Sequence, residues 1–182
     1  VHVDLTATTR AAFQRYVFPK SDVSRVLLDA YPDAEYGYQN LETEITWIDD
    51  RRIEGFVHHI CDNTGYVMTQ DYKLYFALEF NKPFESMGGW TDKSKALEKM
   101  NHGLTYESVQ NNTKTIKGSG SVGAFVNFKT TANDTILVRS SISLVSTENA
   151  WLNLEKEITE PFGWNFEKVV KKQQDIWDQY LG

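Results

Sequence analysis

The sequence has a single cysteine, Cys61, so no disulfide can form within the chain. An apolar core must therefore hold the fold, and one cysteine does not indicate a cellular compartment. A run of basic residues that could neutralise a row of phosphates is also missing, and the net charge is -6. These features argue against a nucleic acid partner.

Long apolar runs are absent as well, and no stretch has the length of a membrane-spanning segment. A signal peptide is not visible either, because residues 1–10 already alternate like a folded strand. We therefore expect either a cytosolic protein or a piece of a longer one, and we favour the second interpretation.

Motifs for nucleophilic or paired-carboxylate catalysis are not apparent. The sequence has no G-x-S-x-G elbow. A glycosidase needs two carboxylates across the bond that it cuts. The candidates that the sequence offers are Glu42 with Glu44, Asp49 with Asp50, and Glu155 with Glu157. Each pair lies on a polar face or in a turn, which favours solvated charge, and we predict no catalytic residue in this chain.

Two further patterns resemble binding motifs but lack their context. Residues 118–123 match the dinucleotide pattern G-x-G-x-x-G, yet a strand-like segment follows where a phosphate-binding helix is required. We expect a flexible hairpin turn there. His59 and Cys61 share a strand face, but two ligands do not complete a metal site, so no metal is expected.

What the sequence does contain is alternation. The clearest case is residues 134–158, where a period-two strand leads at Ser146 or Thr147 into a helix with Ala150, Trp151 and Leu154 at helical spacing. Other strand-like segments lie at residues 1–8, 11–18, 24–30, 41–48, 51–61, 72–80, 111–117 and 121–130. A second amphipathic helix is predicted after Asn165. The pattern predicts a mainly β fold, an antiparallel β-sandwich with one or two α-helices at its C-terminal end.

Aromatic residues provide the remaining candidates. Met87 to Trp90 should bend at its glycines, and an exposed Trp90 indole there could stack on a sugar, although packing in a core or interface is the favoured interpretation, because aromatic side chains are chiefly apolar contact area. Trp151, Trp164 and Trp177 gather at the C-terminal end. We expect them to form a surface that is covered by the sheet or by another domain, and we assign them to interdomain packing.

Several stretches together resemble glycoside hydrolase family 92, the calcium-dependent exo-acting α-mannosidases. They are Leu5–Pro19 (LTATTRAAFQRYVFP), Tyr75–Phe84, Ala124–Thr130, Gly163–Leu181 and, most specifically, Ser141–Ile158 (SISLVSTENAWLNLEKEI). The resemblance implies part of an N-terminal β-sandwich joined to an (α/α)6 toroid that carries calcium and the acid and base carboxylates. The Gly- and His-containing stretch with which the family's domain usually begins is missing, and Ala12 and Gln14 depart from its Gly and His.

The resemblance divides the chain into a sandwich portion, residues 1–158, and a connector with an amphipathic helix, residues 159–182, that leads towards the toroid. It implies a non-catalytic portion of an inverting α-mannosidase that acts on mannose-containing glycans in the periplasm or outside the cell. No family catalytic or calcium-binding residue can be placed on this sequence. The alternatives are a stand-alone carbohydrate-binding module or a structural β-domain, and cut sheet edges predict self-association.

Overall fold

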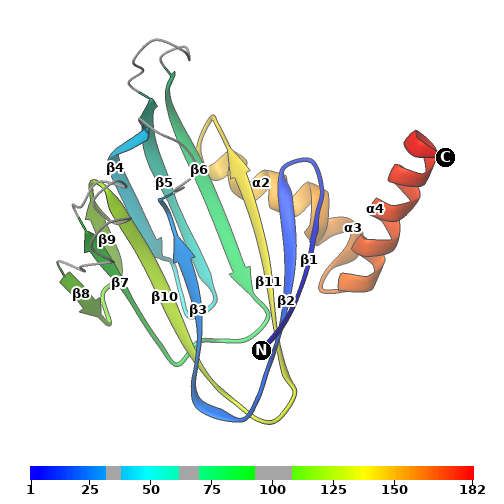
Figure 1. Ribbon diagram of the computed structural model, residues 1–182, viewed down its shortest axis with the longest axis horizontal. Helices are drawn as coiled ribbons and strands as arrows, with labels where there is room; N and C mark the ends of the chain where they lie inside the picture. The colour runs from blue at the N-terminus through cyan, green and yellow to red at the C-terminus, as the bar shows by residue number, and fades with distance from the viewer. Residues whose placement is uncertain (32–37, 62–69, 93–107) are drawn as a thin grey trace.

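The computed structural model describes residues 1–31, 38–61, 70–92 and 108–182, which form two packed β-sheets and a helical tail (Figure 1). In these ranges the larger sheet, sheet A, has the strand order β1-β2-β11-β6-β5-β4-β9. All its neighbouring strands are antiparallel. The strands are β1 His2–Ala7, β2 Ala11–Phe18, β4 Tyr38–Trp47, β5 Arg52–Cys61, β6 Gln70–Phe80, β9 Thr115–Gly118 and β11 Asp134–Ser143.

The smaller sheet, sheet B, faces the inner side of sheet A. In the described part of the chain its order is β3-β10-β7-β8, again antiparallel. Its strands are β3 Ser21–Asp29, β7 Ser86–Asp92, β8 Ser108–Asn111 and β10 Ser121–Thr130. The mainly β sandwich predicted from the alternating sequence is confirmed.

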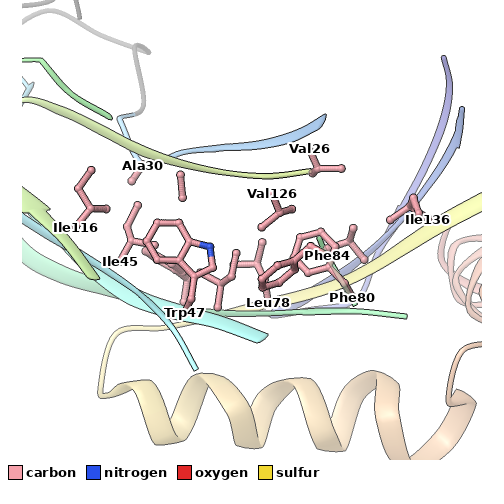
Figure 2. Close-up of a cluster of buried hydrophobic side chains, with 14 of the residues drawn as sticks. Val26, Ala30, Ile45, Trp47, Leu78, Phe80, Phe84, Ile116, Val126 and Ile136 are labelled. Carbon is pink, nitrogen blue, oxygen red and sulfur yellow. The ribbon is translucent and has the colours of Figure 1, made fainter. Parts of the chain in front are cut away.

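The main core lies between the two sheets, where the alternating apolar side chains of each sheet point inward. β5 shows the pattern well: its buried residues are Ile53, Gly55, Val57, His59 and Cys61, and the residues that alternate with them are only partly buried. Figure 2 shows the centre of this core, with contributions from both sheets. Its labelled members are Val26, Ala30, Ile45, Trp47, Leu78, Phe80, Phe84, Ile116, Val126 and Ile136.

Sheet A is wider than sheet B, so part of its inner face is left open. Figure 1 shows β2 and β1 extending past β3, which is an edge strand of sheet B. Leu5 on β1 is 69% exposed, and Ile142 near the end of β11 is 47% exposed. A cavity of about 520 Å³ lies between β3 and this uncovered part of sheet A. We call the open region, formed by the inner faces of β1, β2 and the end of β11, the overhang.

The outer face of sheet A is covered on one side by the helical tail. The tail consists of α2 Thr147–Leu154, the π-helical turn η1 Glu155–Thr159, α3 Glu160–Phe162 and α4 Phe166–Leu181. Ser146 caps α2 by accepting a hydrogen bond from the Asn149 amide, as the sequence predicted. The tail and β2 share a second core, made of Ala11, Phe13, Leu154, Ile158, Phe166 and Val169.

A buried arginine joins the sheet to this tail. Arg139 on β11 is 3% exposed and forms an ion pair with Glu79 of β6. Its guanidinium also donates to the Gly163 carbonyl at 3.1 Å and lies 3.8 Å from the centre of the Trp164 ring. The polar residues Arg139, Ser141 and Ser143, which alternate along β11, are buried because the tail covers this face of the strand.

Two local predictions from the sequence are wrong. The expected bend at Met87 to Trp90 is strand β7. The expected hairpin at Gly118 to Gly120 instead carries the chain from sheet A to sheet B, since β9 pairs with β4 while β10 pairs with β3 and β7. The segment that follows Ile158 is helical through Phe162, and the helix breaks at Gly163, whose φ is 56°.

Other local predictions fall wholly or partly on residues 32–37, 62–69 and 93–107, which lie outside the described residues. They include the turn at residues 62–65, the helical turn expected near residues 92–103 and most of the loop at residues 31–40.

Candidate functional site

Glu42, Glu44, Asp49 and Glu157, four of the six carboxylates considered for acid–base catalysis, have structural partners. Glu42 lies 3.6 Å from the Lys73 ammonium, and Glu44 lies 2.8 Å from that of Lys117. Asp49 accepts hydrogen bonds from the backbone amides of the turn that it begins, at 2.8 and 2.9 Å. These contacts give the carboxylates structural roles in the sheet and its turns.

Glu157 is the most constrained of these carboxylates. Its two oxygens accept from the Thr8 hydroxyl at 2.6 Å, the Arg10 amide at 2.9 Å and the Arg10 guanidinium at 2.7 Å. Partial burial opposes ionisation, but the hydrogen bonds from Thr8 and Arg10 outweigh it and hold the pKa of Glu157 below its usual value. The contact fastens the β1–β2 turn to the π-helical turn.

None of the described carboxyl groups with a resolved shift has the raised pKa of a general acid. The pKa values of Asp4, Asp49, Asp134, Glu148 and Glu157 are all lowered. A glycosidase acid must keep its proton near neutral pH, which requires a raised pKa. None of these five groups meets that requirement.

His59 and Cys61 lie on the buried face of β5, as their spacing predicted. His59 Nδ1 hydrogen-bonds to the side-chain oxygen of Asn40, and desolvation lowers the pKa of His59. No group of three or more His, Cys, Asp or Glu side chains that could hold a metal ion occurs in residues 1–31, 38–61, 70–92 and 108–182. The described residues thus do not fit the calcium ion that the family resemblance implies.

Trp90 does not occupy the exposed position expected of a sugar-stacking residue. It lies in the middle of β7 and is 8% exposed. Its cross-strand partner is Gly123 of β10, and the indole occupies the space where a Cβ of residue 123 would lie. The burial of Trp90 agrees with packing, the interpretation that the sequence favoured, because sheet pairing places its ring over a glycine.

The three C-terminal tryptophans have different surroundings. Trp151 is partly buried and donates its indole N–H to Glu54 of β5 at 2.7 Å. Trp164 packs edge-to-face on Phe13, with ring centres 6.0 Å apart. Trp177 on α4 is 61% exposed. Sheet A therefore contacts Trp151 and Trp164, whereas Trp177 is exposed to solvent.

The apolar stripe of α4 changes from buried to exposed along the helix. Phe166 and Val169 are 6% and 0% exposed, whereas Tyr180 and Leu181 are 81% and 80% exposed. Figure 1 shows the C-terminal end of α4 extending away from the sandwich. We call Trp177, Tyr180 and Leu181 the α4 patch. Exposed apolar groups gathered on one helix end are typical of a surface that another body covers.

A cleft of about 350 Å³ lies where the first turn of α2 meets the outer face of β4, β5 and β6. Its floor includes Phe56 and Tyr75, whose ring centres are 5.9 Å apart, and its sides carry carboxylates. The lining residues are Glu44, Thr46, Glu54, Gly55, Phe56, Tyr75, Ser146, Thr147 and Glu148. The sequence analysis missed this cleft, since it depends on a register that pairs Glu44 with Phe56 and Phe56 with Tyr75.

The fold places the protein in the class of antiparallel β-sandwiches with a helical tail. The described residues form no recognisable catalytic centre. The family model of the glycosyl hydrolase family 92 N-terminal domain matches residues 1–143. The chain therefore belongs to glycosyl hydrolase family 92, as a member of its N-terminal domain. No curated protein matches the sequence.

Solved structures agree with this fold. A family 92 inverting mannosidase from Bacteroides thetaiotaomicron VPI-5482 superposes with a TM-score of 0.74 at 22% identity, over 99% of this chain and 20% of that one. A family 92 alpha-mannosidase from Bacteroides thetaiotaomicron gives a TM-score of 0.71 at 20% identity, over 97% and 21%. The chain thus spans about a fifth of the length of these relatives. In the described part of the chain, no helix combines the length and apolarity needed to cross a bilayer.

Proposed function

We propose that this chain is the non-catalytic N-terminal portion of an α-mannosidase, in which it supports an (α/α)6 catalytic domain of the same polypeptide. Membership of the family 92 N-terminal domain carries this proposal. The structural relatives, which are mannosidases about five times as long, support it. The lowered pKa values of Glu157 and Asp49 are consistent with structural roles for these two carboxylates.

The α4 patch is the proposed contact with the catalytic domain. It combines Trp177, Tyr180 and Leu181 at the end of the chain, where the helix leaves the sandwich. Trp151 and Trp164 hold the preceding helices on sheet A and so set the direction of α4. The domain division at residues 158 and 159 belongs to this proposal, although the helical tail is continuous across it.

The chemistry of the whole enzyme would be inverting hydrolysis of mannosidic linkages in glycans. One carboxylic acid would protonate the leaving oxygen while a second carboxylate activates water. In this proposal the calcium ion and both carboxylates would lie on the catalytic domain, as the family resemblance implies. Export to the periplasm or the cell exterior belongs to the same proposal.

Two activity measurements test this function. Residues 1–182 alone should release no nitrophenol from 4-nitrophenyl α-mannoside. The polypeptide encoded by the complete reading frame should hydrolyse mannobiose with inversion, as proton NMR of the newly released anomer would show. Hydrolysis by residues 1–182, or an inactive complete polypeptide that binds calcium and is folded, would contradict the proposal.

A further inference from the structure

The overhang is a sheet face without charged side chains. On β1, Leu5 and Ala7 point to the side of sheet B, and their cross-strand partners on β2 are Gln14 and Ala12. Leu5 is 69% exposed, although it lies on the side of the sheet that elsewhere forms the core. The charged residues of both strands alternate with these and therefore lie on the opposite face. An apolar face of this kind is stabilised when another body removes it from water.

The free edge of β3 lies beside this face. In the described part of the chain β3 pairs only with β10. The Ala30 amide donates to the Val122 carbonyl at 3.1 Å, and the direction of the backbone groups alternates along an antiparallel strand. The amides and carbonyls of Arg25, Leu27 and Asp29 therefore point away from β10, to the side of the overhang. Such an edge can accept one further strand.

The shape of the sandwich is complementary to a second copy of itself. Sheet A extends past β3 by β2 and β1, so the sandwich ends in a step (Figure 1). A two-fold axis that runs along the strands, between the two layers, generates a second step that faces the first. The overhang of the second copy then covers that of the first, and its β1 takes the place beside β3. The same contact occurs twice, as a closed isologous interface requires.

β1 and β3 also match in direction and in level. Figure 1 shows both strands running the same way, so the partner's β1 would pair with β3 in parallel. Ala7 at the end of β1 and Leu28 near the end of β3 line the same cavity, which is the one of about 520 Å³. A two-fold axis along the strands preserves this level. Two residues earlier on each strand, the partner's Leu5 therefore comes beside Val26.

This register also brings opposite charges together on the outside. Arg25 is exposed on the outer face of sheet B, where its guanidinium donates to Asn127 at 2.8 Å and lies 4.2 Å from the centre of the Phe125 ring. Asp4 lies on the outer face of sheet A, where it pairs with Arg15. In the parallel pair the partner's Asp4 lies beside Arg25. Opposite charges on neighbouring strands favour pairing.

We propose that two copies of this chain form a closed two-fold dimer, in which each overhang covers the other and β1 of one copy extends sheet B of its partner beside β3. The partner's Leu5 then occupies the cavity next to β3. This proposal concerns the sandwich alone and does not rest on the proposed function.

Isotope-filtered NMR tests the arrangement directly. An equal mixture of ¹³C-labelled and unlabelled chain should show nuclear Overhauser contacts between the Leu5 methyl groups of one copy and the Val26 methyl groups of the other. Sedimentation equilibrium should give a mass of twice the 20.9 kDa monomer and no higher, because a two-fold contact closes on itself.

Arg25→Glu tests the register. It should raise the dissociation constant of the dimer about tenfold or more, because it places a carboxylate beside the partner's Asp4. Lys114→Glu is the matched control, since it makes the same change of charge at an exposed residue in the turn before β9, at the far edge of sheet A. The control should dimerise like the parent chain, and both variants should keep the parent circular dichroism spectrum.

Three results would overturn the proposal: a monomer at high concentration, larger species without the contact between Leu5 and Val26, or equal dissociation constants for the two variants. A monomeric complete polypeptide whose Leu5 methyl groups are protected from a soluble paramagnetic agent would overturn it as well. That result would assign the overhang to a segment outside residues 1–182. None of these measurements involves mannoside hydrolysis, so failure here is distinguishable from failure of the proposed function.

Discussion

Charged residues on the outer face of sheet A position the helical tail. Arg139 is covered by Trp164 and tied to Glu79 and to the Gly163 carbonyl. Glu157 links the tail to Thr8 and Arg10. Both side chains are removed from solvent at least in part. The cost of desolvating their charges is offset only while these partners stay in place. Individual polar residues thus fix the direction in which the tail leaves the sheet.

Glu157 should make stability depend on pH. Its folded pKa is lowered, so its contribution is present above the unfolded pKa and is lost as the pH falls through the folded pKa. We expect Glu157→Gln to reduce the free energy of unfolding at neutral pH by about 1–3 kcal/mol, because it weakens three hydrogen bonds. Urea titrations should show this difference shrinking as the pH falls below about 4.

The control for this prediction is Glu155→Gln. Glu155 is exposed and lies in the same π-helical turn. Its replacement should change stability little at either pH. An equal effect of both variants at neutral pH would show that the Thr8 and Arg10 contacts do not stabilise the tail.

At the scale of elements, β7 and β10 are fitted to each other by glycine opposite an aromatic ring. Trp90 faces Gly123, and Phe125 of the same strand faces Gly88. The Trp90 indole lies over the Gly123 backbone, and the Arg25 guanidinium lies 4.2 Å from the centre of the Phe125 ring. This complementarity explains how sheet B buries large aromatic residues, with Trp90 and Phe125 only 8% and 5% exposed.

Gly123→Ala should disrupt this fit. A Cβ at residue 123 would lie 2.0 Å from Cζ2 of Trp90, so the indole or the strand must shift. We expect a loss of about 1–3 kcal/mol of stability, as overpacking usually costs, and a red shift of tryptophan emission as Trp90 gains exposure. Lys129→Ala, on the same face of β10 but exposed, should leave both measurements unchanged. A variant as stable as the parent, with unshifted emission, would show that Trp90 has room to move.

At the scale of the whole molecule, the two sheets differ in width, and the overhang carries exposed apolar groups. Asp4 of β1 pairs with Arg15, and Arg15 contacts Glu167 of α4, so Asp4 lies on the outer face of sheet A. Because successive residues of a strand point to opposite faces, Leu5 points to the inner face, towards sheet B. Only part of this face has a sheet opposite it, and β3 presents a free edge beside the cavity. Such edges favour association with other polypeptide.

Residues 1–182 alone should therefore self-associate as concentration rises. Sedimentation velocity should detect species larger than the 20.9 kDa monomer, and Leu5→Lys should reduce them because it places a charge on the overhang. The matched control is Leu152→Lys on the outer surface of α2, where Leu152 is 46% exposed. A clean monomer at high concentration would contradict the prediction.

The sequence by itself determined the type and approximate limits of most elements. Residues 134–158 are the clearest case, since the period changes from two to 3.6 at Ser146 and the observed cap is at that residue. Asn165 likewise caps α4 as predicted. These features depend on residues near one another in the chain, so local physical chemistry was sufficient to predict them.

Only the tertiary structure decided which strands pair, which polar faces are covered and where side chains meet. Gly88 and Gly89 predict a bend by local propensity, yet pairing with β10 makes them strand because their missing side chains admit the rings and backbone opposite. The cleft of Phe56 and Tyr75 arises in the same way from the register of three strands. Register and coverage are set by contacts between distant residues, and no local pattern encodes them.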